Sequence, residues 1–144
     1  SGDLTLNLTN LGKKILMKTL PLLFENKLIG KKQDETKATY ANKFTPEDRK
    51  INFYNSADDV FNHIRAHGPK PGSWFKYKGE RIKIIKAKKA TSEGKPGTVL
   101  DEKFTVGCSK NAVQILEIKK EGKQKMTTKE FLKGNRIKIG KNLK

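Results

Sequence analysis

The sequence has one cysteine, no long apolar run and few acidic residues. Cys108 has no partner for an intrachain disulfide, and a single cysteine cannot form a cysteine-based zinc site. No apolar stretch approaches the roughly 20 residues that a membrane-spanning helix needs. These absences argue against a disulfide scaffold, a cysteine-type zinc finger and a transmembrane helix. In the apolar run "FTVGCSK", Cys108 is expected to be a small core residue rather than a reactive thiol.

The shortage of acidic residues leaves the chain strongly positive. Only 15 Asp and Glu residues stand against 32 Lys and Arg residues, which gives a formal net charge of +17 over 144 residues. Such a surface repels itself, and the partners that relieve the repulsion are nucleic acids or an anionic membrane surface. The alternative is a generally lysine-rich surface with no such partner. We expect a cytoplasmic, monomeric protein.

The positive charge is concentrated in the later part of the chain. Residues 1–50 carry 10 basic and 6 acidic side chains, whereas residues 51–144 carry 22 and 9. The net charges are therefore +4 and +13. This difference predicts a boundary near residue 50.

The first part has one helical pattern followed by an irregular segment. Residues 9–26 have apolar side chains near helical spacing, and Pro21 predicts a kink or a break. This helix needs a partner surface, which the next thirty residues do not supply. Residues 30–52 have mixed charges and weak periodicity, as linkers do. Because the chain starts in mid-pattern after "SG", we expect it to be the later part of a longer protein.

The second part alternates between short strands and two capped helices. Ser56 is expected to cap a helix ending near Gly68, and Thr127 with Glu130 predicts a capping box. Strands are expected over residues 73–78, 81–89, 97–102, 104–110, 112–120 and 135–143. The predicted fold is mainly β with flanking helices: a small OB-like (Greek-key) β-barrel, which protects sheet edges economically.

The first two strands of this predicted barrel carry a basic face. Its residues are candidate nucleic-acid contacts, because lysine and arginine bind phosphates without reading sequence: Lys76, Lys78, Arg81, Lys83, Lys86 and Lys88. Trp74 lies among them. It is expected to be a core residue, with stacking on an exposed base as the alternative.

No catalytic, cofactor or metal site is predicted. His63 and His67 are spaced as a possible metal pair, but no third ligand of a fitting type is nearby except Asp59, whose capping role is sufficient. Asp34 and Glu35 are adjacent on an extended segment, where neighbouring side chains point in opposite directions, so contacts within the linker are expected rather than acid–base chemistry.

Several stretches resemble the carboxy-terminal half of bacterial methionyl-tRNA formyltransferases. They are, in order, "QDETKATYANKFTPEDRKINF", "IRAHGPKPGSWF", "PGTVL", "VGC" and "GKQKMTTKEFLKGNRIKIG". The first and last are the most specific. The resemblance extends from about Asp3 to Leu143, nearly the whole chain.

The resemblance implies a role in translation initiation. In the family, an amino-terminal domain transfers a formyl group from 10-formyltetrahydrofolate to the amino group of methionyl initiator tRNA. The carboxy-terminal barrel holds the tRNA. Residues 1–29 would then be the last helix of a truncated catalytic domain, residues 30–52 the linker and residues 53–144 the barrel. The implied partners are initiator methionyl-tRNA and a catalytic domain in cis, without a membrane.

The family's catalytic and folate-binding motifs do not occur in this sequence. The chain is therefore expected to be inactive alone and to hold no cofactor, although the parent protein would be an enzyme. Two alternatives remain: a stand-alone OB-fold nucleic-acid-binding protein, and a fragment of a sugar or folate formyltransferase.

Overall fold

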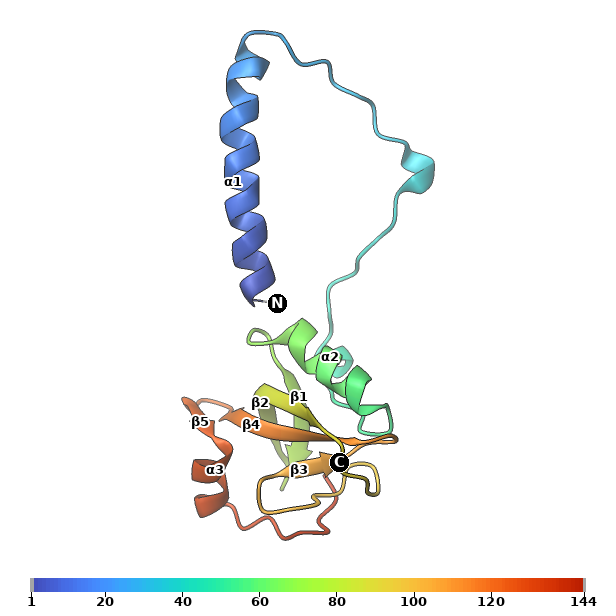
Figure 1. Cartoon of the computed structure of the whole chain (residues 1–144), viewed down its shortest axis with the longest axis vertical. Helices are drawn as coiled ribbons and strands as arrows, with labels where there is room; N and C mark the ends of the chain where they lie inside the picture. The colour runs from blue at the N-terminus through green and yellow to red at the C-terminus, as the bar shows by residue number, and fades with distance from the viewer. Residues whose placement is uncertain (1, 144) are drawn as a thin grey trace. The chain divides into compact units, whose positions relative to one another are not determined.

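The chain folds as two compact units in a computed structural model that describes residues 2–143 (Figure 1). The first, Gly2–Phe44, is called the helical unit, and the second, Thr45–Lys144, the sheet unit. This division reflects internal packing. The domain boundaries predicted after residues 29 and 52 stay predictions.

The helical unit consists mainly of one long helix, α1 (Gly2–Phe24). No residue of α1 is buried, although the helix is rich in leucine. The helix does not break at Pro21 but continues through it to Phe24, although the proline has no N–H to donate to the carbonyl four residues earlier. The Glu25 amide donates to the Pro21 carbonyl at 3.0 Å, which closes the following turn. Further along, a short 3₁₀ turn, η1 (Glu35–Lys37), is capped by the Asp34 carboxylate.

The sheet unit begins with a 3₁₀ turn, η2 (Glu47–Arg49), and helix α2 (Ala57–His67). The predicted cap of α2 is confirmed, since the Asp59 amide donates to the Ser56 hydroxyl. The Asp59 carboxylate in turn accepts from that hydroxyl at 2.6 Å. The buried face of α2 packs on the sheet through Val60 and Ile64.

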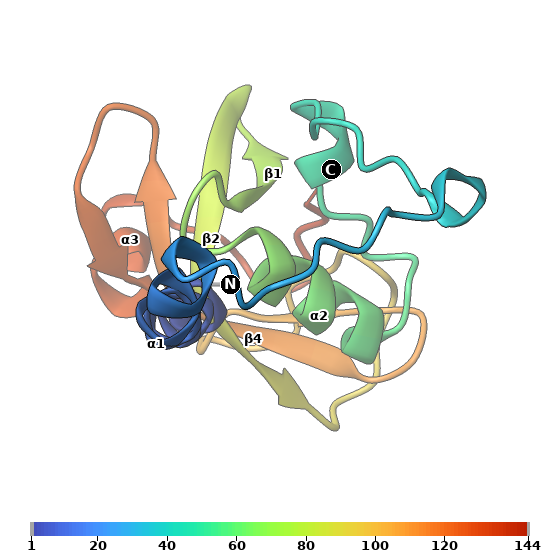
Figure 2. The ribbon, with the colours of Figure 1, turned by 90° about the horizontal axis from the view of Figure 1, so that it is seen from above.

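Five antiparallel strands form one sheet beneath α2. They are β1 (Ser73–Tyr77), β2 (Glu80–Ala90), β3 (Thr105–Gly107), β4 (Ala112–Lys120) and β5 (Lys125–Thr127). The order is β1-β2-β4-β3, and β5 also pairs with β4. Lys78 and Gly79 both have positive φ, as the two-residue turn between β1 and β2 requires. Figure 2 shows this turn and the β4–β5 turn at the same end of the sheet.

The predicted class, mainly β with flanking helices, is confirmed, but the sheet is not a closed barrel. Of the two extra strands predicted, residues 97–102 and 135–143, only isolated bridges remain among the described residues: Val99 with Val106, and Thr98 with Asn142. Gly97 and Gly140 have positive φ, which bends each segment out of an extended path. The sheet therefore continues past β3 without forming a regular ladder.

The core lies between the inner face of the sheet, α2 and the last helix, α3 (Thr128–Gly134). The capping box predicted from Thr127 and Glu130 is confirmed, and it aims Phe131 into the core. Strand β5, which precedes α3, was not predicted. The wholly or almost wholly buried side chains include Phe75, Ile82, Ile84, Phe104, Val113, Ile115, Ile118 and Phe131. Within residues 2–143, no helix has the length and apolar character needed to cross a membrane.

Candidate nucleic-acid interface

The six predicted contact residues lie on β1, β2 and the turn between them. Lys76 is on β1, Lys78 is in the turn, and Arg81, Lys83, Lys86 and Lys88 are on β2. Strand register decides which of them share a face, because residues directly opposite one another project to the same side. Lys76 lies opposite Arg81; Lys76 stands between two buried residues, and the residue after Arg81, Ile82, is also buried. These two therefore point away from the core, onto what we call the outer face.

A row of lysines crosses the outer face from strand to strand. Lys83 pairs with Trp74 on one side and with Lys119 on the other, and Lys119 pairs with Lys125. Neighbouring strands lie about 4.8 Å apart, so three like charges follow one another at close spacing. Like charges directly opposite one another destabilise a sheet unless something compensates them. Lys119 and Lys125 were not predicted; the ending "EIKK" of the predicted strand 112–120 was the available signal.

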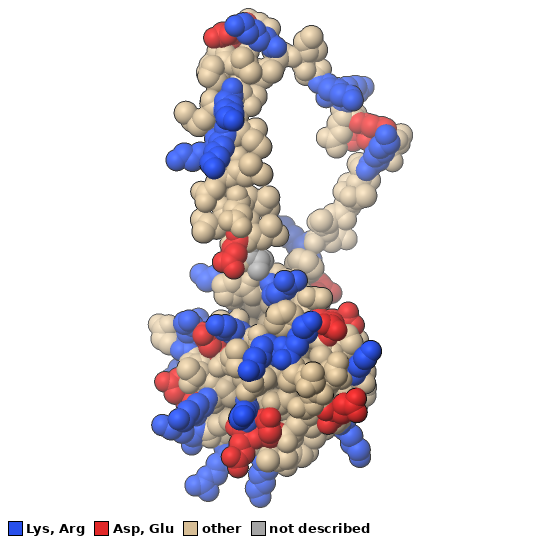
Figure 3. Space-filling view, viewed as in Figure 1, with Lys and Arg blue, Asp and Glu red and all other residues tan. Residues whose placement is uncertain are grey.

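The basic row continues along β2 beyond a bulge. The register shifts around Ile85, which returns Lys86 to the outer face opposite Glu117, and Lys88 then pairs with Gln114. Glu117 is the one acidic residue of this ladder among the described strands, and its carboxylate lies 3.1 Å from Lys125. Among residues 2–143, no carboxylate lies within 4 Å of five cations of this face: Lys76, Lys83, Lys86, Lys88 and Lys119. Figure 3 shows how widely Lys and Arg side chains are spread over the visible surface.

Trp74 lies on the outer face, yet it is buried. The segment Pro46–Ile51 covers it: the indole N–H donates to the Pro46 carbonyl at 2.8 Å, and the Ile51 amide donates to the Trp74 carbonyl. The guanidinium carbon of Arg81 lies 4.6 Å from the ring centre, and Arg81 also contacts the Glu47 carboxylate at 3.5 Å. Trp74 is therefore 5% exposed and closed to base stacking.

His63 and His67 support this segment and the adjoining corner. The His63 Nε2 lies 2.9 Å from the Asp48 carbonyl, and its Nδ1 lies 3.1 Å from the Ser73 hydroxyl. His67 Nδ1 lies 3.0 Å from the His63 carbonyl. Within residues 2–143, no group of three or more potential ligand residues is arranged to hold a metal. The observed contacts of His63 and His67 are thus made to other residues of the protein.

The environment of the single cysteine indicates a structural role for its thiol. Cys108 is buried in the core, and this burial raises the pKa of its thiol to about 11. The thiol is therefore protonated at neutral pH and is a poor nucleophile. The prediction of a core residue is confirmed by its burial.

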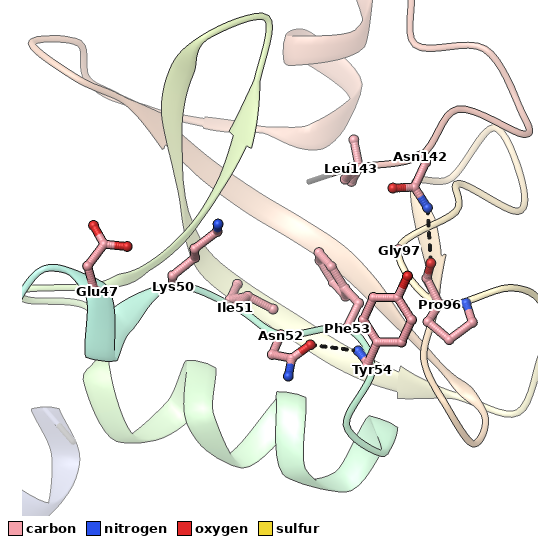
Figure 4. Close-up of a pocket in the computed structure, with 10 residues that line it drawn as sticks. All are labelled: Glu47, Lys50, Ile51, Asn52, Phe53, Tyr54, Pro96, Gly97, Asn142 and Leu143. Carbon is pink, nitrogen blue, oxygen red and sulfur yellow. Dashed lines mark hydrogen bonds between the residues drawn. The ribbon is translucent and has the colours of Figure 1, made fainter.

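A pocket of about 450 Å³ opens beside the covering segment (Figure 4). Its walls come from Glu47, residues 50–54, and residues 96–97 and 142–143. The Asn142 amide donates to the Pro96 carbonyl, and the Asn52 side chain accepts from the Tyr54 amide. The first bond ties two wall segments together, the second lies within one segment, and each commits one polar atom of a side-chain amide to the protein itself.

Comparison with known proteins shows which protein family the sequence matches. The family model described as formyl transferase, C-terminal domain, matches residues 43–136. The chain is 34% identical over 144 residues to the methionyl-tRNA formyltransferase of Bradyrhizobium diazoefficiens, covering 97% of this chain and 46% of that protein. It is 42% identical over 141 residues to the one from Caldanaerobacter subterraneus subsp. tengcongensis, covering 95% and 46%. The resemblance inferred from the motifs is confirmed, and the chain spans less than half the length of these curated relatives.

A solved structure supports the fold. The crystal structure of HypX from Aquifex aeolicus in complex with tetrahydrofolic acid superposes with a TM-score of 0.67 at 21% identity, over 83% of this chain and 22% of that one. At this identity the likeness concerns the fold alone.

Proposed function

The chain belongs to the family of formyl transferase C-terminal domains, and we propose that it is the tRNA-binding part of a methionyl-tRNA formyltransferase. The whole enzyme would transfer a formyl group from 10-formyltetrahydrofolate to the amino group of methionyl initiator tRNA. In this proposal a catalytic domain lies in cis, and this chain supplies affinity for RNA. It performs no chemistry by itself.

The observation that carries the proposal is the lysine row across the outer face. Lys83, Lys119 and Lys125 occupy successive strands in one row, and Lys76 and Arg81 lie in the next. A polyanion relieves the repulsion between them, and a flat, extended row suits the regular charges of an RNA backbone. Lysine-rich contacts of this kind give affinity through counterion release and do not read sequence.

The proposal is tested by measuring tRNA binding as a function of salt. The logarithm of the binding constant should fall linearly with the logarithm of salt concentration, by about 0.7 to 0.9 for each phosphate engaged. A slope near zero would contradict RNA binding through this face.

Reversing the charge of selected lysines shows which surface of the chain contacts RNA. Changing Lys76, Lys78 and Lys83 to Glu should weaken binding to many RNAs about equally. The matched control changes Lys13, Lys14 and Lys18, all on α1, to Glu, which alters the net charge by the same amount. If the control weakens binding as much as the face variant, the outer face has no special role. If only one RNA is affected, the contacts read sequence and the assignment of these lysines to phosphates is wrong.

The inactivity of the chain alone is a separate part of the proposal. Incubating it with 10-formyltetrahydrofolate and methionyl-tRNA should give no formylated product, whereas formylation by the chain alone would overturn this assignment. The gene of origin decides against a stand-alone nucleic-acid-binding protein if it encodes a doubly wound domain upstream in the same reading frame.

A further inference from the structure

The lysine row of the outer face continues beyond Lys83 to the covering segment. Lys83 pairs with Trp74, and Trp74 forms a bridge with Lys50, so Lys50 occupies the next position of the row beyond the indole. The Lys50 ammonium lies 5.9 Å from the centre of the Trp74 ring, which places both side chains on the outer face. Among the residues that the structure describes, no carboxylate lies within 4 Å of this ammonium. Since Lys50 also lines the pocket of about 450 Å³, the basic row leads directly to that pocket.

The pocket itself has no surplus of charge. Its two charged lining residues are Lys50 and Glu47, whose formal charges cancel, and the other lining residues are uncharged. The Glu47 carboxylate already contacts Arg81 at 3.5 Å. Pockets for small organic groups typically measure about 300 to 1,000 Å³, which includes the volume found here. The pocket therefore suits a neutral group better than a phosphate.

Tyr54 gives the pocket an accessible aromatic ring. It is 74% exposed, and it is the only exposed aromatic residue among the described residues of the sheet unit. Its backbone is held in place, because its amide donates to the Asn52 side chain at 3.0 Å and the preceding residue, Phe53, is buried in the core. Bases of any type can stack on such a ring, since each has a π-face. Because Trp74 is closed to stacking, Tyr54 is the ring of this unit that a base can reach.

The opposite wall of the pocket carries a hydrogen-bond acceptor, the side-chain oxygen of Asn142. The Asn142 nitrogen donates to the Pro96 carbonyl, and Figure 4 shows the oxygen on the side turned away from Pro96. None of the described residues donates a hydrogen bond to this oxygen. The wall is already formed, because the Leu143 amide donates to the Gly97 carbonyl at 2.7 Å. Proteins recognise unpaired RNA bases by this combination of an aromatic ring and hydrogen bonds to the base edge.

We propose that this pocket receives one unpaired base of a bound RNA, which stacks on Tyr54 and donates a hydrogen bond from its edge to the Asn142 oxygen. Lys50 contacts the adjoining phosphate, and the RNA backbone follows the lysine row. The inference rests on the proposed function and adds a contact that distinguishes an unpaired nucleotide from a paired one. The lysine row alone makes no such distinction, because it contacts phosphates.

The first test compares a blunt RNA duplex with the same duplex carrying a short single-stranded overhang. Binding of the full chain to each is measured by fluorescence anisotropy. Tyr54→Ala should weaken binding to the overhang duplex about 5- to 150-fold, the effect of losing one stacked base, and leave binding to the blunt duplex unchanged. The control Tyr40→Ala, which removes an exposed tyrosine of the helical unit, should affect neither. An equal loss for both duplexes with Tyr54→Ala would overturn the base pocket.

The second test separates stacking from charge. Tyr54→Phe keeps the ring and should bind the overhang duplex as the wild-type chain does, and a loss as large as that of Tyr54→Ala would rule out stacking. Lys50→Gln should lower the salt slope for this duplex by about 0.7, and an unchanged slope would contradict its phosphate contact. If the wild-type chain binds both duplexes and Tyr54→Ala changes neither, the base pocket alone is wrong. A wild-type chain that binds neither duplex would refute the proposed function and the pocket together.

Discussion

The helical unit exposes its large apolar side chains, whereas the sheet unit buries them. Leu4 and Phe24 of α1 are 62% and 77% exposed, while Phe75 and Ile84 are fully buried. A helix without tertiary packing has little stability of its own. The comparison shows that the packing energy of this chain resides in residues 45–143, and that leucine content alone does not make a core.

The largest expected effect comes from deleting one aromatic ring in each unit. Phe75→Ala removes a ring that is packed edge-on against Phe104, and such a change costs about 3 to 5 kcal/mol of unfolding free energy. Phe24→Ala, in the helical unit, should cost less than about 0.5 kcal/mol. Urea unfolding followed by circular dichroism measures both. Comparable losses would mean that α1 is packed against another surface in solution.

Removing a capping residue from each unit should give a smaller difference in unfolding free energy. Thr127→Ala breaks the capping box of α3, which holds Phe131 in the core, and should cost about 1 kcal/mol. Asp34→Ala removes the cap of η1, a turn with no buried residue, so the midpoint of global unfolding should not move. The same urea titration compares them. A shift with Asp34→Ala would show that the helical unit contributes to the cooperative transition.

The smallest expected difference between the two units concerns their loss of stability in acid. Burial favours the neutral form of Asp101, but hydrogen bonds from Thr105 and the Lys103 amide outweigh it and lower the pKa of this carboxyl. A lowered folded-state pKa stabilises the fold above the ordinary value of 3.8, and that contribution is lost as the pH falls through the folded-state value.

The Asp101→Asn variant should therefore lose less stability than the wild-type sheet unit as the pH falls below 3.8. Asp34 also has a lowered pKa, because the Thr36 side chain and then Lys37 bond to it, yet Asp34→Asn should leave that acid limb unchanged. Thermal unfolding between pH 2 and 6 measures both variants. Equal flattening by the two would mean that the units unfold together.

Local signals in the sequence predicted local structure well. The caps at Ser56 and Thr127 depend on residues three positions apart, and both are confirmed. Lys76, which was predicted on the basic face, does lie exposed on β1 between the buried residues Phe75 and Tyr77. Each of these features depends on neighbours in the chain, which the sequence displays directly.

Features set by distant contacts could not be read from the sequence. Residues 97–102 have a strand-like composition, but their path depends on bridges to β3 and to the end of the chain. Lys119 and Lys125 join the basic row only through the register of β4 with its neighbours. Trp74 was expected in the core, and it is buried on the opposite side by a segment 23 to 28 residues earlier in the chain.

Trp74 is the only tryptophan of the chain, and its indole is bonded to the Pro46 carbonyl. Tryptophan emission depends on solvent access to the ring, so this residue gives an optical signal that belongs to one contact. Detachment of Pro46–Ile51 would wet the indole and shift its emission to longer wavelength, even while the sheet beneath stays folded. The attachment of the covering segment to β1 can thus be followed by the emission of Trp74, without an added dye.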